Sequence, residues 1–337
     1  MISFRDHDTE VTLEPGSCWP TPLRPRDQSY RDTAAEEIWA IIADITAGEP
    51  WRECLRRRIA RRDPWLHRIV TGPERDLFFR QHPPKSGALV LDIGAGWGQI
   101  ALPLARTHLV TALEPTPERL AFIQAAAKQD GCANRLACVQ ADFLDATFAT
   151  RFDLVCCIGV LEWVPKFRAG PPRKLQRDFL AHIRALLAPG GELVVGIENR
   201  LGLKYLLGAR DDHTGTSFIH MFEAELAARK FQAAKGEELR VLTHSLAEYS
   251  ALFREAGFSR VESFAAFPDY KLPQLILPLA DTAAFNARLE KERLPDEHDG
   301  VDGTPLPNQE ELRSLYRSLA HIQVAHGFAP SYVFVCR

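Results

Sequence analysis

Three closely spaced glycines follow an apolar run in segment 89–100, which reads LVLDIGAGWGQI. The apolar run predicts a buried strand, and the residues after the glycines predict the start of a helix. Gly94, Gly96 and Gly98 have no Cβ atom, so the backbone can turn sharply there and approach a ligand whose groups meet the loop amides. The segment is therefore expected to be a nucleotide-type binding loop between a strand and a helix.

The spacing of these glycines narrows the class of ligand. Gln99 stands where a glycine would complete the dinucleotide pattern G-x-G-x-x-G. The lysine followed by serine or threonine of a P-loop is also missing. Other parts of the sequence are therefore needed to identify the adenosine cofactor that the loop binds.

Composition places the chain among soluble globular enzymes. Its 337 residues, 46% hydrophobic and 25% charged, are enough for one large domain or two smaller ones. The net charge of −3 argues against a general nucleic-acid binder. Seven cysteines without a C-x-x-C pair predict reduced thiols and a cytoplasmic location. The start lacks the apolar core of a signal peptide, and no apolar run of about 18 residues predicts a membrane span.

Strand-like and helix-like runs alternate from residue 87 onward, which is typical of parallel strands joined by crossover helices. Seven strands are predicted, at 88–93, 108–113, 135–140, 152–158, 192–197, 260–264 and 332–335. Helices are predicted at 100–106, 117–129, 173–187 and 246–256. The fold class expected is α/β, a Rossmann-like, mostly parallel sheet with helices on both faces.

Two long stretches do not fit a minimal domain of this class, and they are predicted to be ordered insertions, 199–243 and 268–330. Both leave from the carboxyl ends of strands, where ligands bind in open α/β sheets, so we expect them to form lids over the substrate. Residues 1–84 contain helical patterns at 34–47 and 51–62 and predict an N-terminal helical extension. The cofactor domain is then expected to span 85–337.

Two acidic positions favour a cofactor with a single adenosine. Glu114 ends the second strand, where a carboxylate can accept hydrogen bonds from both hydroxyls of a ribose, as it also does in NAD enzymes. Asp142 and Phe143 end the third strand. The carboxylate of Asp142 suits the amine of an adenine, and the ring of Phe143 suits the face of the adenine ring. A local helix cap is the alternative interpretation of Asp142.

With these motifs in this order, the chain resembles class I S-adenosylmethionine-dependent methyltransferases. The resemblance covers about 85–265 and the last strand, and it implies S-adenosyl-L-methionine as the cofactor. It assigns cofactor contacts to Asp92, Gly94, Ala95, Gly96, Gly98, Glu114, Asp142, Phe143, Gly159 and Leu161, with Asp92 at the cofactor's amino group. Many relatives have Leu-Glu-His-Val where this chain has Leu161-Glu162-Trp163-Val164, so an acid–base role of that histidine does not carry over.

The acceptor site is expected in the polar clusters after the fifth strand. His213 is the candidate general base, because an imidazole can take a hydroxyl proton while a neighbouring carboxylate, Asp212, orients it. His220 is the reserve base. The alternative is that Asp211 and Asp212 cap a helix and His213 is an exposed loop residue. No metal is assigned, although Glu198, Asn199 and Asp212 offer oxygen ligands suited to magnesium.

The segments ENRLGLKY, DHTG and PDYKLP also resemble methyltransferase domains that occur with bacterial surface-polysaccharide glycosyltransferases. That resemblance implies a sugar hydroxyl as the acceptor. Asp269, Tyr270 and Lys271 are expected either to form a wall of the acceptor pocket or to be a plain strand exit. Six arginines could attract a phosphate-bearing acceptor, although a solvated helix face explains them as well: Arg52, Arg56, Arg57, Arg58, Arg61 and Arg62.

The sequence thus predicts an O-methyltransferase of a carbohydrate or related polar hydroxyl, with a small-molecule or glycan acceptor. One alternative is a methyltransferase of a small aromatic or polyketide-like metabolite, for which the apolar segment 272–279 could line a pocket. Another is a cofactor-binding partner subunit without activity, and a nicotinamide oxidoreductase fits the glycine spacing least well. No nucleic-acid partner is expected, and a homodimer is one of the assemblies left open.

Overall fold

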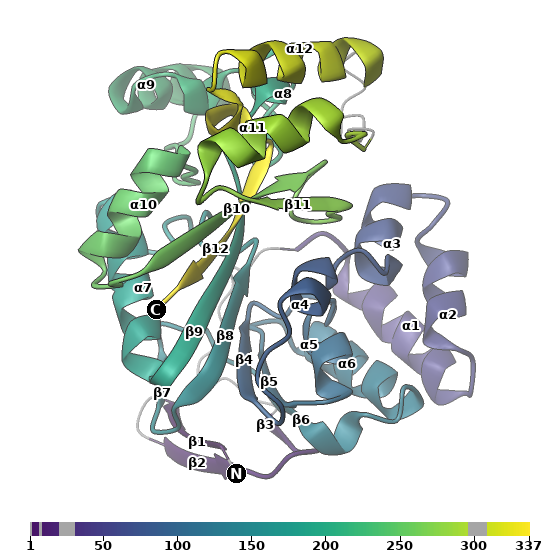
Figure 1. Cartoon of the computed structure of the whole chain (residues 1–337). Coiled ribbons are helices and arrows are strands. Elements are labelled where there is room, and N and C mark those ends of the chain that lie inside the picture. Colours follow the sequence, from purple (N-terminus) through teal and green to yellow (C-terminus); the bar gives the residue numbers. More distant parts are fainter. Residues whose placement is uncertain (1, 7–8, 20–30, 296–308) are drawn as a thin grey trace. The chain divides into compact units, whose positions relative to one another are not determined.

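The computed structural model describes residues 2–6, 9–19, 31–295 and 309–337. The chain forms two compact units. The first contains residues 1–157 and 185–193, and the second contains residues 158–184 and 194–337. Figure 1 follows the chain through both units.

The first unit is built on parallel strands. They are β3 (Cys18–Trp19), β4 (Leu89–Ile93), β5 (Leu109–Leu113), β6 (Leu136–Val139) and β8 (Phe152–Ile158), in the order β8-β4-β5-β6-β3. In the register, Leu91 of β4 lies opposite Thr111 of β5 and Val155 of β8. These strands are apolar along almost their whole length because helices cover parallel sheets.

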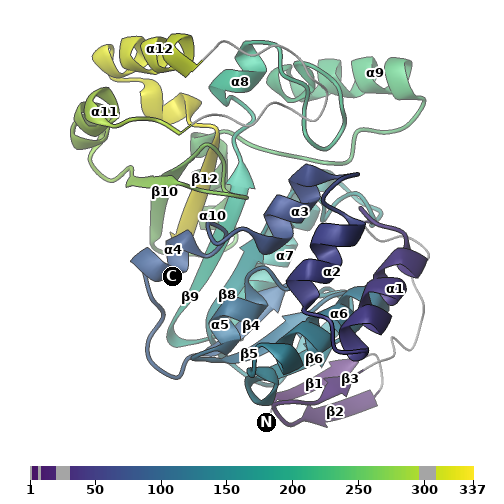
Figure 2. The ribbon, with the colours of Figure 1, turned by 90° about the vertical axis from the view of Figure 1, so that its right-hand side faces the viewer.

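The helices of the first unit are α1 (Ala35–Thr46), α2 (Trp51–Arg58), α3 (Pro64–Thr71), α4 (Leu77–Gln81), α5 (Ala101–Ala105), α6 (Pro117–Gln129) and the short η1 (Ala133–Arg135). Helix α1 buries Ile38, Ile41 and Ile45, whose spacing places them on one face. It packs on α6 and α2, and α2 contacts α3, so α1, α2 and α3 lie side by side (Figure 2).

The N-terminal extension also contains strands that the helical prediction missed. Strands β1 (Ile2–Asp6) and β2 (Thr9–Leu13) form an antiparallel sheet with β7 (Ala146–Phe148). Their side chains alternate between apolar and polar residues, as expected for a sheet with one buried face. The pairing of β1 with β7 joins the start of the chain to residues 146–148, a contact that local sequence patterns do not reveal.

The second unit contains antiparallel strands. Strand β9 (Leu187–Glu198) begins in the first unit and ends in the second, where β10 (Val261–Phe267), β11 (Leu275–Pro278) and β12 (Ser331–Cys336) are added in the order β11-β10-β12-β9. Strand β10 is antiparallel to both β11 and β12, with Phe264 opposite Val333. The last strand of the chain, β12, therefore lies between β9 and β10 and is antiparallel to β10.

Two longer helices support these strands, α7 (Pro172–Leu186) and α10 (Leu246–Glu255). Helix α10 begins with a capping box in which Ser245 and Glu248 satisfy backbone groups of the first turn. Its Tyr249 and Phe253 rings lie 5.4 and 5.0 Å from the ring of Phe334 on β12. This aromatic contact fixes α10 next to the last strand.

Both insertions are ordered where the structure describes them. The first contains α8 (Leu203–Leu206), η2 (Ile219–Met221) and α9 (Ala224–Lys235). The second contains β11, α11 (Thr282–Lys291), α12 (Gln309–His321) and η3 (Ala325–Phe328), and its residues 296–308 lie outside the described residues. Their role as lids stays a prediction.

All seven predicted strands are present, and the described residues contain five more, at positions that the sequence did not indicate: β1, β2, β3, β7 and β11. The mostly parallel α/β class is confirmed. All seven cysteines are free thiols. Among the described residues, no helix is long and apolar enough to cross a membrane.

Candidate active site

The glycine loop of the first unit has the backbone shape that its sequence predicts. Gly94, Gly96 and Gly98 have φ angles of 66°, 55° and 81°, a region that favours glycine. The amides of Gly94 and Ala95 donate hydrogen bonds to the carbonyl of Leu113, at 2.8 and 3.0 Å. These bonds tie the loop to the end of β5.

Gly98 is also required by packing. A Cβ atom built there would lie 3.0 Å from Cγ1 of Ile123 and 3.0 Å from Cγ of Leu102. Contacts this short require a neighbouring side chain to move. The third glycine therefore lets the loop pack closely against α6.

Glu114 follows β5 and lies beside the loop. It is only 3% exposed, and its Oε2 accepts a hydrogen bond from the Gly96 amide at 3.0 Å. Its Oε1 accepts one from the Thr116 amide at 3.2 Å and lies 3.7 Å from Nη1 of Arg119. The carboxylate is thus held against the glycine loop, and its bonding to a ribose stays a prediction.

Asp92 lies at the end of β4, two residues before the first glycine. Its side chain is buried, and Oδ2 has no hydrogen-bond partner. Burial raises the pKa of this carboxyl to about 7, although Arg75 and the Ala101 amide act in the opposite direction. A buried carboxylate with a free oxygen is suited to bind the ammonium group of a cofactor.

Asp142 and Phe143 follow β6. Oδ1 of Asp142 accepts a hydrogen bond from the Leu144 amide at 2.9 Å within a turn, and no helix begins there, so the helix cap that the sequence offered as the alternative is not formed. Phe143 is buried. Contact with an adenine stays a prediction for both residues.

Gly159 and Leu161 belong to the second unit and follow β8. Gly159 has φ 72°, and its amide donates to the carbonyl of Gly196 at 2.9 Å. A Cβ at Gly159 would lie 2.7 Å from the hydroxyl oxygen of Tyr270, so this position needs glycine for space as well. Leu161 is fully buried, and its carbonyl accepts a hydrogen bond from Gln176 of α7 at 2.9 Å. The turn is thereby fixed just before Glu162.

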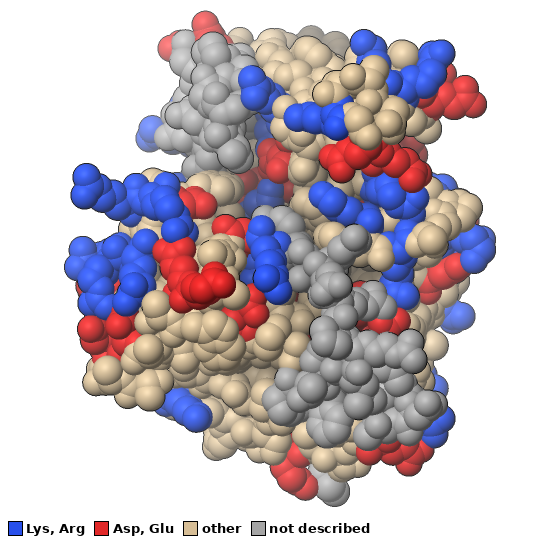
Figure 3. All heavy atoms as spheres, turned by 180° about the vertical axis from the view of Figure 1, so that it is seen from behind, with Lys and Arg blue, Asp and Glu red and all other residues tan. Residues whose placement is uncertain are grey.

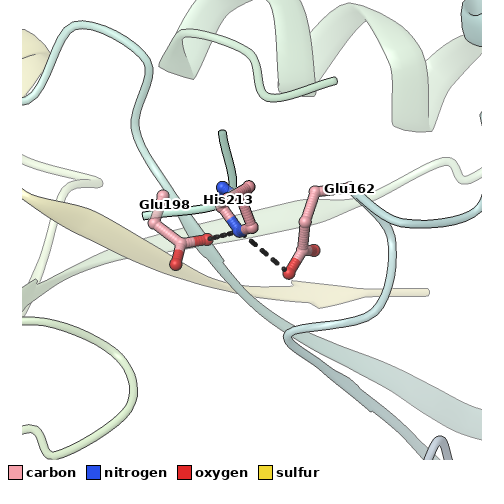
Figure 4. Close-up of side chains that lie close together, drawn as sticks. All are labelled: Glu162, Glu198 and His213. Atoms are coloured by element: carbon pink, nitrogen blue, oxygen red, sulfur yellow. Dashed lines mark ion pairs between the residues drawn. The ribbon is translucent and has the colours of Figure 1, made fainter. Parts of the chain in front are cut away.

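Glu162, Glu198 and His213 form what we call the acid–histidine centre. Nε2 of His213 lies 3.6 Å from Oε1 of Glu162 and 3.6 Å from Oε2 of Glu198. The imidazole lies between the two carboxylates (Figure 4). All three side chains are at most 4% exposed. Glu162 follows β8, Glu198 ends β9, and His213 comes from the first insertion, so the fold brings together residues far apart in the sequence.

Asp211, and not Asp212, is the acid that orients His213. Oδ2 of Asp211 lies 3.4 Å from Nδ1 of His213 and 3.4 Å from Nε2 of His220. Its Oδ1 accepts hydrogen bonds from the amides of His213 and Thr214, at 3.1 and 2.8 Å. The prediction that Asp212 orients the imidazole is wrong, because the turn directs the Asp211 side chain inward. The prediction of an exposed loop histidine is wrong too.

Asp212 belongs to a different group of charges. Its Oδ2 lies 2.7 Å from Nζ of Lys271, and its Oδ1 lies 3.4 Å from Nζ of Lys204. Lys271 also contacts Oε1 of Glu198 at 2.6 Å, so this lysine connects Asp212 to the acid–histidine centre. The segment that contains Lys271 is therefore more than a plain strand exit.

The side chain of Asn199 is buried and is held by hydrogen bonds away from the acid–histidine centre. Its Nδ2 donates to the carbonyls of Gly327 and Ala329, at 2.9 and 2.8 Å, and lies 3.0 Å from the hydroxyl of Tyr332. Its Oδ1 accepts a hydrogen bond from the Leu201 amide at 3.0 Å. The magnesium set of Glu198, Asn199 and Asp212 is therefore not formed, and of its three members only Glu198 lies in the acid–histidine centre.

Charge shifts the pKa values in the centre. Burial alone would lower the pKa of His213, but Glu198, then Asp211 and Glu162, hold it well above its ordinary value. Burial raises the pKa of Glu162, and contact with His213 only partly opposes this. A protonated imidazole cannot accept a proton, so His213 is not ready to act as a general base while it pairs with both glutamates.

The arginines of the N-terminal extension are largely neutralised by acids. Five of the six lie in ion pairs: Arg52 with Asp130, Arg56 with Glu53, Arg57 with Asp44 and Glu49, Arg58 with Asp44, and Arg62 with Glu37. Basic and acidic side chains lie next to one another on the face seen in Figure 3. These contacts favour a solvated helix face over a phosphate site.

The sequence profile of a family described as "Methyltransferase domain" matches residues 90–191, from β4 and the glycine loop into the first residues of β9. The chain carries a class I S-adenosylmethionine-dependent methyltransferase domain. The cofactor of this methyltransferase is S-adenosylmethionine, as predicted. The match ends before the insertions, so it says nothing about the acceptor.

Curated relatives include the ubiquinone biosynthesis O-methyltransferase of Methylocella silvestris, 29% identical over 59% of this chain and 78% of that protein. The mitochondrial enzyme of the same name from Schizosaccharomyces pombe is 32% identical over 38% of this chain and 44% of that protein. A solved phosphoethanolamine N-methyltransferase 2 of Haemonchus contortus with S-adenosyl-L-methionine aligns at 16% identity, with a TM-score of 0.44, over 85% of this chain and 59% of that one. A structural similarity of this size adds nothing to the assignment.

Two features of the site escaped sequence reasoning. Glu162 is part of the motif carried over from the family, but its two neighbours in the centre lie 36 and 51 residues further along the chain. Lys271 lies in a segment that the sequence singled out, yet nothing local indicated a contact with Glu198. For Glu162, the only signal in the sequence was its acidic side chain within the family motif, between Leu161 and Trp163.

Proposed function

We propose that the methyltransferase transfers the methyl group to a hydroxyl oxygen of a polar acceptor, with a carbohydrate or related polyol as the leading class. The observation that supports this is the buried acid–histidine centre, whose Glu162 directly follows the Gly159 and Leu161 segment in the sequence. In the reaction, the acceptor oxygen forms a bond to the methyl carbon. The bond from sulfur to that carbon breaks with its electron pair staying on sulfur, and the hydroxyl proton leaves to water.

Glu162 is the residue best suited to hold the acceptor. Neither of its carboxylate oxygens has a hydrogen-bond partner, and the side chain is fully buried. A hydroxyl that donates to one of these oxygens would relieve the cost of leaving a buried acceptor atom unpaired. Holding the nucleophile in line with the methyl group can supply much of the rate acceleration.

The surrounding charges support a hydroxyl-rich acceptor. Lys204, Lys271 and Asp212 place donors and acceptors next to the centre. Polar groups of both kinds are needed to bind a sugar, whose hydroxyls both donate and accept. The resemblance to surface-polysaccharide methyltransferases also favours a sugar acceptor. A cytoplasmic location and a homodimer remain predictions.

A phenolic hydroxyl is the second candidate. The curated relatives described above are named ubiquinone biosynthesis O-methyltransferases. In this chain the ring of Trp163 lies 5.1 Å from the imidazole of His213, at 72°, and offers an aromatic surface beside the centre. Such a surface suits an aromatic acceptor as well as the face of a sugar ring.

A transfer assay with a methyl-labelled donor tests the proposal and separates the two acceptor classes. The substrates are free sugars, nucleotide sugars and oligosaccharides on one side and catechols and other phenols on the other. We expect label in the sugars, a strong loss of turnover in Glu162→Gln, and unchanged turnover in Glu255→Gln, a control that removes an exposed carboxylate of α10. Label only in phenols shifts the assignment to the second candidate. Binding of the demethylated cofactor without label in any hydroxyl contradicts the proposal.

A further inference from the structure

We infer that the acid–histidine centre is a binding site for a divalent metal ion, with Glu162, Glu198 and His213 as its protein ligands. One ligand atom from each residue lies within 4.8 Å of the other two. In tetrahedral coordination at about 2.1 Å, ligand atoms lie about 3.4 Å apart. The distances of 3.6 Å from Nε2 of His213 to each glutamate are close to that spacing.

The orientation of His213 supplies the second argument. An ionised Asp211 only accepts hydrogen bonds, so the contact at 3.4 Å places the hydrogen of the ring on Nδ1. Nε2 of the same ring faces the carboxylates of Glu162 and Glu198, and a cation bound between them would replace the proton of the charged imidazole. Histidines that bind metals are oriented in this way, with the second ring nitrogen donating to a carboxylate.

Glu162 supplies an independent argument. It is fully buried, and both of its oxygens lack a hydrogen-bond partner. Lys271 compensates Glu198 and Asp212, whereas His213 is the ion-pair partner that the structure gives for Glu162. A buried carboxylate needs an opposite charge or a set of hydrogen bonds to be stable, and a bound cation supplies that charge directly.

The type of ligand selects the type of ion. Two carboxylates and one imidazole suit Mn²⁺, Fe²⁺ or Zn²⁺ better than Ca²⁺, which prefers oxygen ligands alone. Three protein ligands also leave coordination positions open, as in catalytic rather than structural sites. Use of an open position by an acceptor oxygen rests on the proposed function, whereas binding of the ion does not.

Metal binding to the full-length protein tests the inference. The purified protein is treated with a chelator, dialysed and titrated with Mn²⁺, and free Mn²⁺ is followed by its electron paramagnetic resonance signal. Metal content after dialysis against Zn²⁺ is measured by mass spectrometry. We expect one ion per chain and at least about a tenfold loss of affinity in Glu162→Gln and in His213→Ala, with a smaller loss in Asp211→Asn, which changes only the orienting acid.

His321→Ala is the matched control, because it removes an exposed imidazole of α12. Affinity for the demethylated cofactor, measured on the same preparations, shows that each variant is folded. The inference is overturned if the wild-type protein binds no Mn²⁺ or Zn²⁺ at millimolar concentration, or if the ligand variants bind as the wild type does. Label transfer to a hydroxyl by a protein that binds no ion would overturn the metal site and leave the proposed function intact.

Discussion

The buried carboxyl of Asp92 predicts a strong pH dependence of cofactor affinity. Burial raises its pKa to about 7 in the protein without cofactor. If the ammonium group of S-adenosylmethionine binds the ionised form, affinity rises with pH and levels off above about 7. At pH 5 only about 1% of Asp92 is ionised, so affinity there is about 100-fold weaker, which corresponds to about 2.7 kcal/mol.

Calorimetric titration with the demethylated cofactor between pH 5 and 7.5 measures this dependence. Titration at pH 6 in two buffers with different enthalpies of ionisation counts the protons released, and we expect about 0.9 per molecule bound. Asp92→Asn should bind weakly at every pH and release no proton. The same variant should be more stable than wild type at pH 8 without cofactor, because it removes a buried charge. Constant affinity over this range, or the same slope in Asp92→Asn, would refute the assignment of Asp92.

Three further predictions follow from local geometry. Gly98→Ala should lower the free energy of unfolding in urea by about 3 kcal/mol, because alanine there would be both left-handed and crowded by its neighbours. Gly131 has φ 71° but open space around it, so Gly131→Ala should lower that free energy by only about 1 kcal/mol. Equal losses in the two variants would contradict the packing argument. Burial opposes ionisation of Glu248, but Arg200 and then Ser245 lower its pKa to about 2, so its stabilising contribution is complete above about pH 4.5 and disappears as the pH falls through 2. The urea midpoints of Glu248→Gln and wild type should therefore differ at pH 7 and converge near pH 2, and a constant difference would exclude this pair as the cause. Arg57→Ala should leave turnover within about twofold in the labelled-donor assay, because two carboxylates already pair with its guanidinium; a large loss would restore the phosphate-site interpretation.

The parallel strands and the cofactor loop could be predicted because their signals are local. An apolar run, three glycines and an acid after the next strand occupy fixed positions relative to one another. Helix 117–129 was predicted with the bounds that α6 has, since Pro117 begins it and an apolar face follows. The small sheet of β1, β2 and β7 could not be predicted, because its pairing joins residues more than 130 positions apart.

The acid–histidine centre could be predicted from the sequence only in part. His213 was identified from its polar neighbours, but the choice between Asp211 and Asp212 depends on the direction of one turn, which only the structure reveals. Glu162 and Glu198 meet because β8 and β9 end at the same place in the second unit. The sequence gives no distance between two such strand ends, and for this reason the magnesium set that it suggested contained Asn199.

The measurement that tests the account most directly compares turnover with cofactor binding in His213→Ala. Turnover is measured by label transfer to the best acceptor, and affinity for the demethylated cofactor is measured by calorimetry on the same preparation. If His213 belongs to the acceptor side of the reaction, turnover should fall at least about 100-fold while cofactor affinity stays within about twofold. Unchanged turnover, or an equal loss of cofactor affinity, would contradict the role assigned to the acid–histidine centre.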